Sequence, residues 1–248
     1  MSNERVDYDL ASETYDNTRK PSELLVARFA DRVALTAETT ILDFGCGTGN
    51  YLNSIQTTFG ARCCGVEPSD KMRAIASDKN KSVDVRRGDH RNIPFDAGKF
   101  DFVYMTDVIP HVPERDVMLS ELWRVSKAGC FLCVVTESHE QIQRRFYNDY
   151  FPSLAANEHR RYPKIQAIVE SSARAGFTHE DTEVIATSTA TTITERFLTN
   201  VEEKNYSMFR LLDENEFVEG LSKLKVNKGK TFDSCCGGES LIWLRKGI

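Results

Sequence analysis

The sequence predicts an α/β fold: a doubly wound, mostly parallel sheet with helices on both faces. Short apolar runs alternate with amphipathic helical patterns through the first 136 residues, which is typical of βαβ units and a parallel sheet. One predicted strand ends in an acid and leads through a glycine-rich turn into a helix, as at the ligand-binding edge of such sheets. The length of 248 residues suits one domain with insertions, and no internal repeat or linker divides the chain.

Composition and charge exclude several classes of protein. Apolar residues make up 40% of the chain and charged residues 28%, which is ordinary for a folded, soluble protein. The formal net charge of -5 argues against long-range attraction to a phosphate backbone. No apolar run approaches the roughly 20 residues of a membrane helix, and residues 1–10 lack the apolar stretch of a signal peptide. We therefore expect a cytoplasmic protein that neither spans a membrane nor binds nucleic acid.

The cysteines predict neither a disulfide framework nor a metal site. There are 7, an odd number, and four of them form two pairs that are adjacent in sequence. Cys130 and Cys133 make a CxxC pattern inside an apolar run that we predict to be a strand. Residues three apart in a strand face opposite sides of the sheet, so these two thiols are expected to pack separately in the core and to bind no shared metal ion.

The elements of the core follow in order from the apolar pattern. A helix is expected at 49–59, directly after the glycine-rich turn. A second helix begins after Ser69, whose hydroxyl is a typical N-cap, and a third spans 117–125. Strands are predicted at 40–44, 62–67, 83–87, 100–106 and 130–136.

Two segments interrupt this alternation and are expected to form a helical cap, because both leave the sheet on the side where ligands bind. Residues 137–161 are polar, aromatic-rich and predicted to be helical, as are residues 194–224. Between and after them we expect a helix at 164–175, a strand at 178–192 and a last strand at 240–245. The expected organisation is a single domain with an N-terminal lid at 1–37, a core at 38–136, cap inserts at 137–161 and 194–226, and the remainder of the core at 162–193 and 227–248.

The strongest local signal is the glycine-rich turn and the acids around it. Gly45, Gly47 and Gly49 permit positive φ angles and let a ligand lie against bare backbone at a helix N-terminus. Glu67 follows 18 residues after Gly49, at the end of the next strand, where a carboxylate can accept hydrogen bonds from both hydroxyls of a ribose. Asp43 precedes the turn, and a carboxylate there suits a ligand that carries an ammonium group better than a pyrophosphate.

In order and spacing, these residues resemble the motifs of class I S-adenosylmethionine-dependent methyltransferases. The turn at 43–49 resembles the first motif, and 65–69 resembles the second. The third is matched by 88–89 with 93–95, the fourth by 99–112, and the turn before the fifth strand by 122–129. Residues 8–19 resemble the lid helix of the ubiquinone/menaquinone-biosynthesis type ("type 11"). The resemblance implies a Rossmann-like sheet with an antiparallel last strand.

The resemblance also implies a binding role for individual residues, with S-adenosyl-L-methionine as cofactor and S-adenosyl-L-homocysteine as its product. The methionine part would lie on the glycine-rich turn beside Asp43, and the ribose on Glu67. The sulfonium would lie above Thr106, Asp107 and Val108. The implied cofactor-binding residues are Tyr8, Tyr15 and Arg19 in the lid, Asp43, Gly45, Cys46, Gly47 and Gly49 in the first motif, Glu67, Pro68, Ser69 and Met72 in the second, Gly88, Asp89 and His90 in the third, and Thr106, Asp107 and Val108 in the fourth.

Residues near the mouth of the sheet are candidates for contact with the methyl acceptor. His111 and His139 follow the fourth and fifth predicted strands, so each is a candidate general base, with a structural histidine as the alternative. In the first insert, Tyr147 and Tyr150 are candidates for substrate binding, with packing in a helix core as the alternative. Arg145 and Arg161 predict an anionic acceptor, unless they form a solvated face.

The function expected from the sequence is methyl transfer to a small-molecule acceptor by in-line displacement, in a monomer or homodimer. One alternative is methylation of a metalloid or thiol, for which Cys235 and Cys236 are the relevant feature. The other is a partner protein that binds the cofactor without turnover. The sequence Asn-Pro-Pro-Tyr, which marks amino-methylating enzymes of nucleic acids, is absent after the fourth strand.

Overall fold

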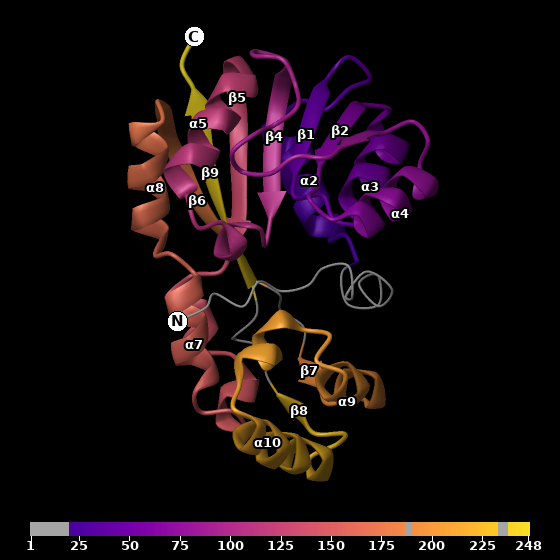
Figure 1. Cartoon of the computed structure of the whole chain (residues 1–248), viewed down its shortest axis with the longest axis vertical. Helices are drawn as coiled ribbons and strands as arrows, with labels where there is room; N and C mark the ends of the chain where they lie inside the picture. The colour runs from indigo at the N-terminus through magenta and orange to yellow at the C-terminus, as the bar shows by residue number, and fades with distance from the viewer. Residues whose placement is uncertain (1–19, 187–189, 233–237) are drawn as a thin grey trace.

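The computed structural model describes residues 20–186, 190–232 and 238–248, and its centre is a seven-stranded sheet (Figure 1). Its strands are β1 Thr40–Phe44, β2 Arg62–Val66, β3 Asp84–Arg86, β4 Phe100–Thr106, β5 Ser126–Thr136, β6 Phe177–Ala186 and β9 Gly238–Lys246. They lie in the order β3-β2-β1-β4-β5-β9-β6. The pairs among β1 to β5 are parallel, and β9 is antiparallel to both β5 and β6. This confirms the predicted sheet, including its antiparallel last strand.

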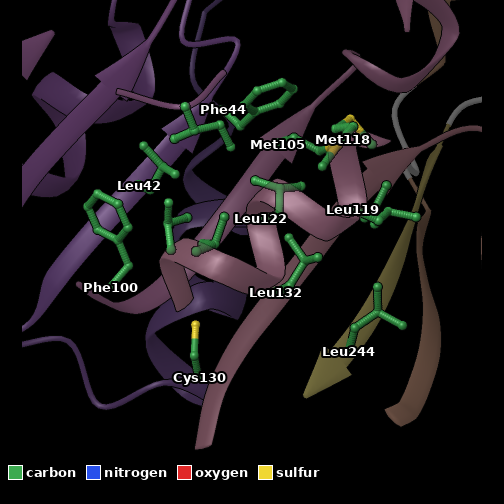
Figure 2. Close-up of a cluster of buried hydrophobic side chains, with 14 of the residues drawn as sticks. Leu42, Phe44, Phe100, Met105, Met118, Leu119, Leu122, Cys130, Leu132 and Leu244 are labelled. Carbon is green, nitrogen blue, oxygen red and sulfur yellow. The ribbon is translucent and has the colours of Figure 1, made fainter. Parts of the chain in front are cut away.

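Helices cover both faces of the sheet, and a separate hydrophobic cluster fills each interface. The helices are α2 Glu23–Arg32, α3 Asn50–Phe59, α4 Asp70–Lys79, α5 Arg115–Val125 and α8 Ile165–Arg174. Side chains of α5 pack with Leu42 and Leu132 on one face (Figure 2), and Ile168 of α8 belongs to the same cluster. Side chains of α2 and α3 pack with Ile41 on the other. Cys130 belongs to the first cluster and Cys133 to the second, so the two thiols face opposite sides, as the strand period predicts.

The two inserts pack on each other as a cap beyond the carboxyl edge of the sheet (Figure 1). Because β6 and β5 are both antiparallel to β9, both inserts leave the sheet at that edge. The cap has a hydrophobic cluster of its own, in which Phe151 and Phe209 are fully buried. Its elements are α6 His139–Gln143, a 3-10 helix at Phe146–Asp149, α7 Leu154–Arg161, β7 Thr191–Thr192, α9 Glu195–Glu202, a 3-10 helix at Ser207–Leu211, α10 Glu214–Val226 and β8 Thr231–Phe232.

The structure departs from the prediction at the strand expected over 178–192. The strand β6 ends at Ala186, which pairs with Gly238 of β9, and residues 187–189 lie outside the described residues. Thr191–Thr192 instead pairs with Thr231–Phe232 in a two-stranded sheet of the cap. The cap therefore includes residues on both sides of the predicted second insert. None of the described helices is long and apolar enough to cross a membrane.

Candidate active site

The glycine-rich turn joins β1 to α3 at the carboxyl edge of the sheet. Gly45, Gly47 and Gly49 have φ values of 78°, 54° and 74°, a region that favours glycine. A Cβ atom on Gly45 would lie 2.5 Å from Val108 Cγ2, so a residue with a side chain would not fit at this position. The amides of Gly45 and Cys46 donate to the carbonyl of the last residue of β2, at 2.8 and 3.1 Å. These bonds hold the turn against β2.

Glu67 directly follows β2 and links the turn to the start of α4. Its side chain is buried, its Oε2 accepts from the Gly47 amide at 3.0 Å, and its Oε1 accepts from the Ser69 amide at 2.9 Å. A carboxylate offers about four lone-pair sites, so two amide bonds orient it without exhausting its capacity to accept. The structure thus brings the predicted ribose acceptor into direct contact with the predicted methionine-binding turn.

Asp43 lies on β1 and is only 2% exposed. Its Oδ1 is buried and has no hydrogen-bond partner among the described residues, and the same is true of the Tyr104 hydroxyl on β4. Burial raises the pKa of Asp43 to about 8; the Tyr104 hydroxyl opposes this rise and the Glu67 carboxylate adds to it. A carboxylate that lacks a partner in this position fits a positively charged group of a ligand.

The residues predicted to surround the adenine follow the adjacent strands β2 and β3. Ser69 caps α4, because its Oγ accepts from the amide of the buried Met72 at 3.2 Å. Asp89 is exposed, and its Oδ1 accepts from the amides two and three residues later, at 2.8 and 3.2 Å. His90 Nε2 lies 3.1 Å from Glu114 Oε2. Pro68 and Gly88 complete this group, and a Cβ on Gly88 would lie 2.7 Å from a backbone oxygen.

Cys46 contributes backbone to the turn, as predicted, and its thiol is a packing group. The side chain is buried, and that burial raises the pKa of the thiol well above its ordinary value, helped by the Asp43 and Glu67 carboxylates. Its Sγ fills the space above Gly65, where a Cβ atom would lie only 2.6 Å away. A thiol held protonated in this way is a poor nucleophile.

Thr106, Asp107 and Val108 stand at the carboxyl end of β4, beside the glycine-rich turn. Asp107 has a φ of 57°, which is uncommon for a residue other than glycine, and its amide donates to the Val135 carbonyl at 3.1 Å. Because Thr106 pairs with Val135, Asp107 lies next to the end of β5, close to Glu137. Strained residues of this kind are frequent at functional sites.

His111 and Arg161 are brought together at the boundary between core and cap. Arg161 Nη2 lies 3.4 Å from His111 Nδ1 and 3.4 Å from Ser207 Oγ. These three side chains come from the segment after β4, from α7 and from the second insert. A guanidinium only donates, so Nδ1 of His111 is the acceptor in this contact and the proton of the neutral ring is on Nε2.

His139 has the contacts of a side chain that joins α6 to α7. Its Nε2 lies 2.7 Å from the Tyr162 carbonyl, and its ring stacks on His159 with centroids 4.4 Å apart. The Nε2 of His159 in turn lies 3.0 Å from the His139 carbonyl. A ring nitrogen next to a carbonyl oxygen has to carry the proton, so Nε2 is the donor and Nδ1 the acceptor of the neutral ring.

Arg145 lies at the centre of a buried ion-pair network rather than on an open face. It is 8% exposed and pairs with Glu137, and its Nη1 lies 3.2 Å from Glu158 Oε2. The other oxygen of Glu158 pairs with Arg161 Nη1 at 2.6 Å. Two carboxylates balance two guanidiniums, so Arg145 serves to join the cap to the end of β5. The prediction that it binds an anionic acceptor finds no support in these contacts.

The two predicted tyrosines occupy different positions in the cap. Tyr150 is buried in the cap core, where its ring packs edge-on against Phe232 at 6.3 Å. Tyr147 is half-buried, packs against Phe209 and lies over the guanidinium of Arg145 at 5.8 Å. Tyr147 therefore lies closer to the sheet edge than the packed Tyr150.

Some predictions fall outside the described residues, namely those for Tyr8, Tyr15, Arg19, Cys235 and Cys236. Among the residues that are described, no group of three or more His, Cys, Asp or Glu side chains could hold a metal ion. Sequence reasoning missed Tyr104 and Glu158 as members of the site. A phenol in an otherwise apolar strand, and a glutamate three residues before an arginine on one helix, were the available signals.

Comparison with known proteins supports the motif assignment. Residues 42–134 match a family described as a methyltransferase domain. Over 108 residues the chain is 29% identical to tocopherol O-methyltransferase, chloroplastic, of Arabidopsis thaliana, and over 144 residues it is 26% identical to demethylmenaquinone methyltransferase of Lactococcus lactis. These matches cover 41% and 54% of the chain, and the chain spans only 31% and 57% of those relatives.

A solved structure extends the likeness of the fold to most of the chain. It is a protein of Anabaena variabilis described as a methyltransferase from an antibiotic biosynthesis pathway. The TM-score is 0.71 with 20% identity, over 91% of this chain and 98% of that one. At this identity the likeness establishes the fold, and the similarity to a methyltransferase domain rests on residues 42–134. In its glycine-rich turn and the strands around it, the chain is thus similar to a methyltransferase domain over residues 42–134.

Proposed function

We propose that this protein transfers the methyl group of S-adenosylmethionine to a small-molecule acceptor held between the carboxyl edge of the sheet and the cap. The observation that carries the proposal is the buried, unpartnered Oδ1 of Asp43 beside the glycine-rich turn. An uncompensated carboxylate is costly in a folded protein, and the ammonium group of the methionine part is a partner of the right charge. Glu67 supports the same orientation of the ligand, because it is already fixed beside the turn.

The cofactor, when bound, supplies a methyl group on a positively charged sulfur, and the neutral thioether formed by the transfer is a good leaving group. The work left to the protein is to orient the two reactants, and pre-organised geometry is worth roughly 7–11 kcal/mol in such reactions. Asp43 and Glu67 would hold the two ends of the methionine and ribose portions. Asp107, held in a strained conformation by its hydrogen bond to β5, would lie beside the sulfur atom from which the methyl group is transferred.

A small-molecule acceptor is supported by the cap and by the polar side chains at its boundary. His111, Arg161 and Ser207 converge there from three separate segments, so they are suited to orient a polar acceptor. By their names, the two relatives methylate tocopherol and demethylmenaquinone, which are small molecules. No general base is required where the acceptor is a neutral amine, thiolate or activated carbon.

The first test is calorimetric titration of the protein with S-adenosylhomocysteine. We expect saturable binding with one site per chain, and binding weaker than millimolar would contradict the proposal. The second test is incubation with methyl-labelled S-adenosylmethionine and a small-molecule extract. Label that appears in a low-mass product supports a methyltransferase, whereas tight binding without any labelled product would favour a cofactor-binding partner protein.

A further inference from the structure

Two buried polar atoms without partners lie on adjacent strands in direct register. Asp43 on β1 and Tyr104 on β4 are partners in the parallel pairing of these strands, so their side chains lie on the same face of the sheet. Tyr104 is fully buried, and neither its hydroxyl nor Asp43 Oδ1 makes a hydrogen bond of good geometry within the described residues, although the hydroxyl is close enough to Asp43 to lower the pKa of that carboxyl. The phenol ring is fixed by Phe29 and Phe102, at centroid distances of 4.9 and 5.6 Å.

The surroundings of Asp43 do not stabilise its negative charge. The groups that act on its ionisation are Tyr104 and Glu67, and the charge of Asp43 is in turn felt by Tyr51 on α3 and by the thiols of Cys46 and Cys63. All of these are acidic or neutral. Of them, only the Tyr104 hydroxyl favours the ionised carboxylate, because it is a donor that faces an acceptor.

We propose that Tyr104 is a positioning residue for the cofactor: its hydroxyl donates to the Asp43 carboxylate when the ammonium group of the methionine part binds to that carboxylate. This inference rests on the proposed function. In the ligand-free protein the hydroxyl is a buried group without a partner, which is unfavourable. In the bound state it is satisfied, and it holds the carboxylate in line with the ammonium group. The same atom therefore has opposite effects on the stability of the empty protein and on ligand affinity.

The variant Tyr104→Phe removes only this atom and separates the two effects. For the empty protein we expect an unchanged or higher Tm, since an unsatisfied buried hydroxyl is lost. For S-adenosylhomocysteine we expect affinity to fall about tenfold or more, as for a lost hydrogen bond to a charged group. For 5′-methylthioadenosine, which has the adenosine part but no amino-acid part, affinity should stay within about twofold. The matched control is Tyr206→Phe in the cap, which should leave both affinities unchanged.

The pH dependence of affinity for S-adenosylhomocysteine is a further test, because removal of a purely structural hydroxyl would not change it. Because Tyr104 opposes the rise in the pKa of Asp43, its removal makes the carboxyl harder to ionise. Between pH 6 and 7.5, where the ligand amine stays protonated, affinity of the wild-type protein for S-adenosylhomocysteine should increase with pH. In Tyr104→Phe this increase should continue to higher pH. In an Asp43→Asn background, Tyr104→Phe should no longer weaken binding, because the carboxylate is gone.

The outcomes are distinct. A lower Tm for Tyr104→Phe with unchanged affinity for S-adenosylhomocysteine overturns the inference and makes the hydroxyl structural. Equal losses for both ligands also overturn it, because the effect would not pass through the ammonium group. Failure of the wild-type protein to bind either ligand overturns the proposed function itself, and this inference with it.

Discussion

The two buried acids beside the glycine-rich turn differ in how their charge is stabilised. Glu67 accepts two backbone amide bonds within the protein, whereas Oδ1 of Asp43 accepts none. Glu67 is therefore oriented within the protein itself, and in the proposed function Asp43 would gain a partner from the ligand. A site that combines a fixed acceptor with an uncompensated one selects for a molecule with hydroxyls at one end and a cation at the other.

The pKa of Asp43 predicts how stability of the empty protein depends on pH. A carboxyl whose pKa is raised from 3.8 to about 8 keeps its proton in the folded state and loses it in the unfolded state between those values. The unfolded state then binds fewer protons, so stability falls as pH rises, on the order of 1 kcal/mol per pH unit. Asp43→Asn removes this dependence. We expect its unfolding free energy to exceed that of wild type by more at pH 8 than at pH 5, as measured by urea denaturation, and an equal difference at both pH values would count against the buried carboxyl.

The two acids of the second and third motifs should differ in their effect on cofactor binding. In Glu67→Gln the amide nitrogen would face the Gly47 or Ser69 amide, donor against donor, at a cost of about 1–3 kcal/mol. We expect affinity for S-adenosylhomocysteine to fall at least about tenfold. Asp89→Asn keeps the Oδ1 acceptor of an exposed side chain and should change affinity by no more than about threefold. Calorimetric titration of both variants checks the order, and a reversed order would contradict the ribose assignment.

At the scale of elements, an ion-pair network fixes the cap to the sheet. Arg145 joins Glu137, which follows β5, to Glu158 on α7. Charges that are buried this deeply stabilise a structure only while every partner is present. The connection also sets the position of Arg161, which shares Glu158 and reaches His111 of the core. One network thus aligns the cap with the edge of β4.

Loss of the central guanidinium should be far more costly than loss of its neighbour. Arg145→Ala leaves Glu137 and Glu158 buried without their shared partner, and we expect a loss of about 3–5 kcal/mol in unfolding free energy. The control is Arg144→Ala, because Arg144 pairs only with exposed Glu140 one turn away, and should cost about 0.5 kcal/mol or less. Urea denaturation of the two variants measures the difference. Similar small losses would mean that the network does not hold the cap.

At the scale of the whole molecule, the sheet region and the cap are each packed around hydrophobic clusters of their own. The sheet and its helices carry the glycine-rich turn, Glu67 and Asp43. The cap is packed around its own cluster, with Phe151 and Phe209 at its centre. In the proposed function, cofactor binding and acceptor selection would be built by different parts of the chain, so that one could change without the other.

A cavity in the cap core should lower turnover of the acceptor without lowering affinity for the cofactor. Phe151→Ala removes a fully buried ring and should destabilise the cap by about 3–5 kcal/mol. We expect turnover of the acceptor to fall strongly while affinity for S-adenosylhomocysteine stays within about threefold, because no cofactor-binding residue lies in that cluster. Hydrogen exchange should accelerate in α7, α9 and α10 but not in β1 or β4. An equal loss of cofactor affinity would show that cap and core fold as one unit.

Local pattern in the sequence was enough for the sheet and for the glycine-rich turn. The strands at Thr40–Phe44 and Phe100–Thr106 have the bounds that their apolar runs predict, and Ser69 caps α4 as expected. The glycine-rich turn needs positive φ at three nearby residues, which only glycine supplies without strain. Information of this kind is contained within a few neighbouring residues, so composition and spacing are sufficient to find it.

Only the tertiary structure decided which distant groups meet. Thr191–Thr192 is not part of the long strand expected over 178–192, because it pairs with Thr231–Phe232 of the cap. Arg145, predicted to bind the substrate, contacts Glu158 on α7, and His139, predicted as a candidate general base, stacks on His159 of the same helix. Asp43 and Tyr104 share a register across two strands that lie far apart in the chain. Pairings of this kind depend on the chain path through space and on the burial it creates, neither of which is contained in the spacing of residues along the chain.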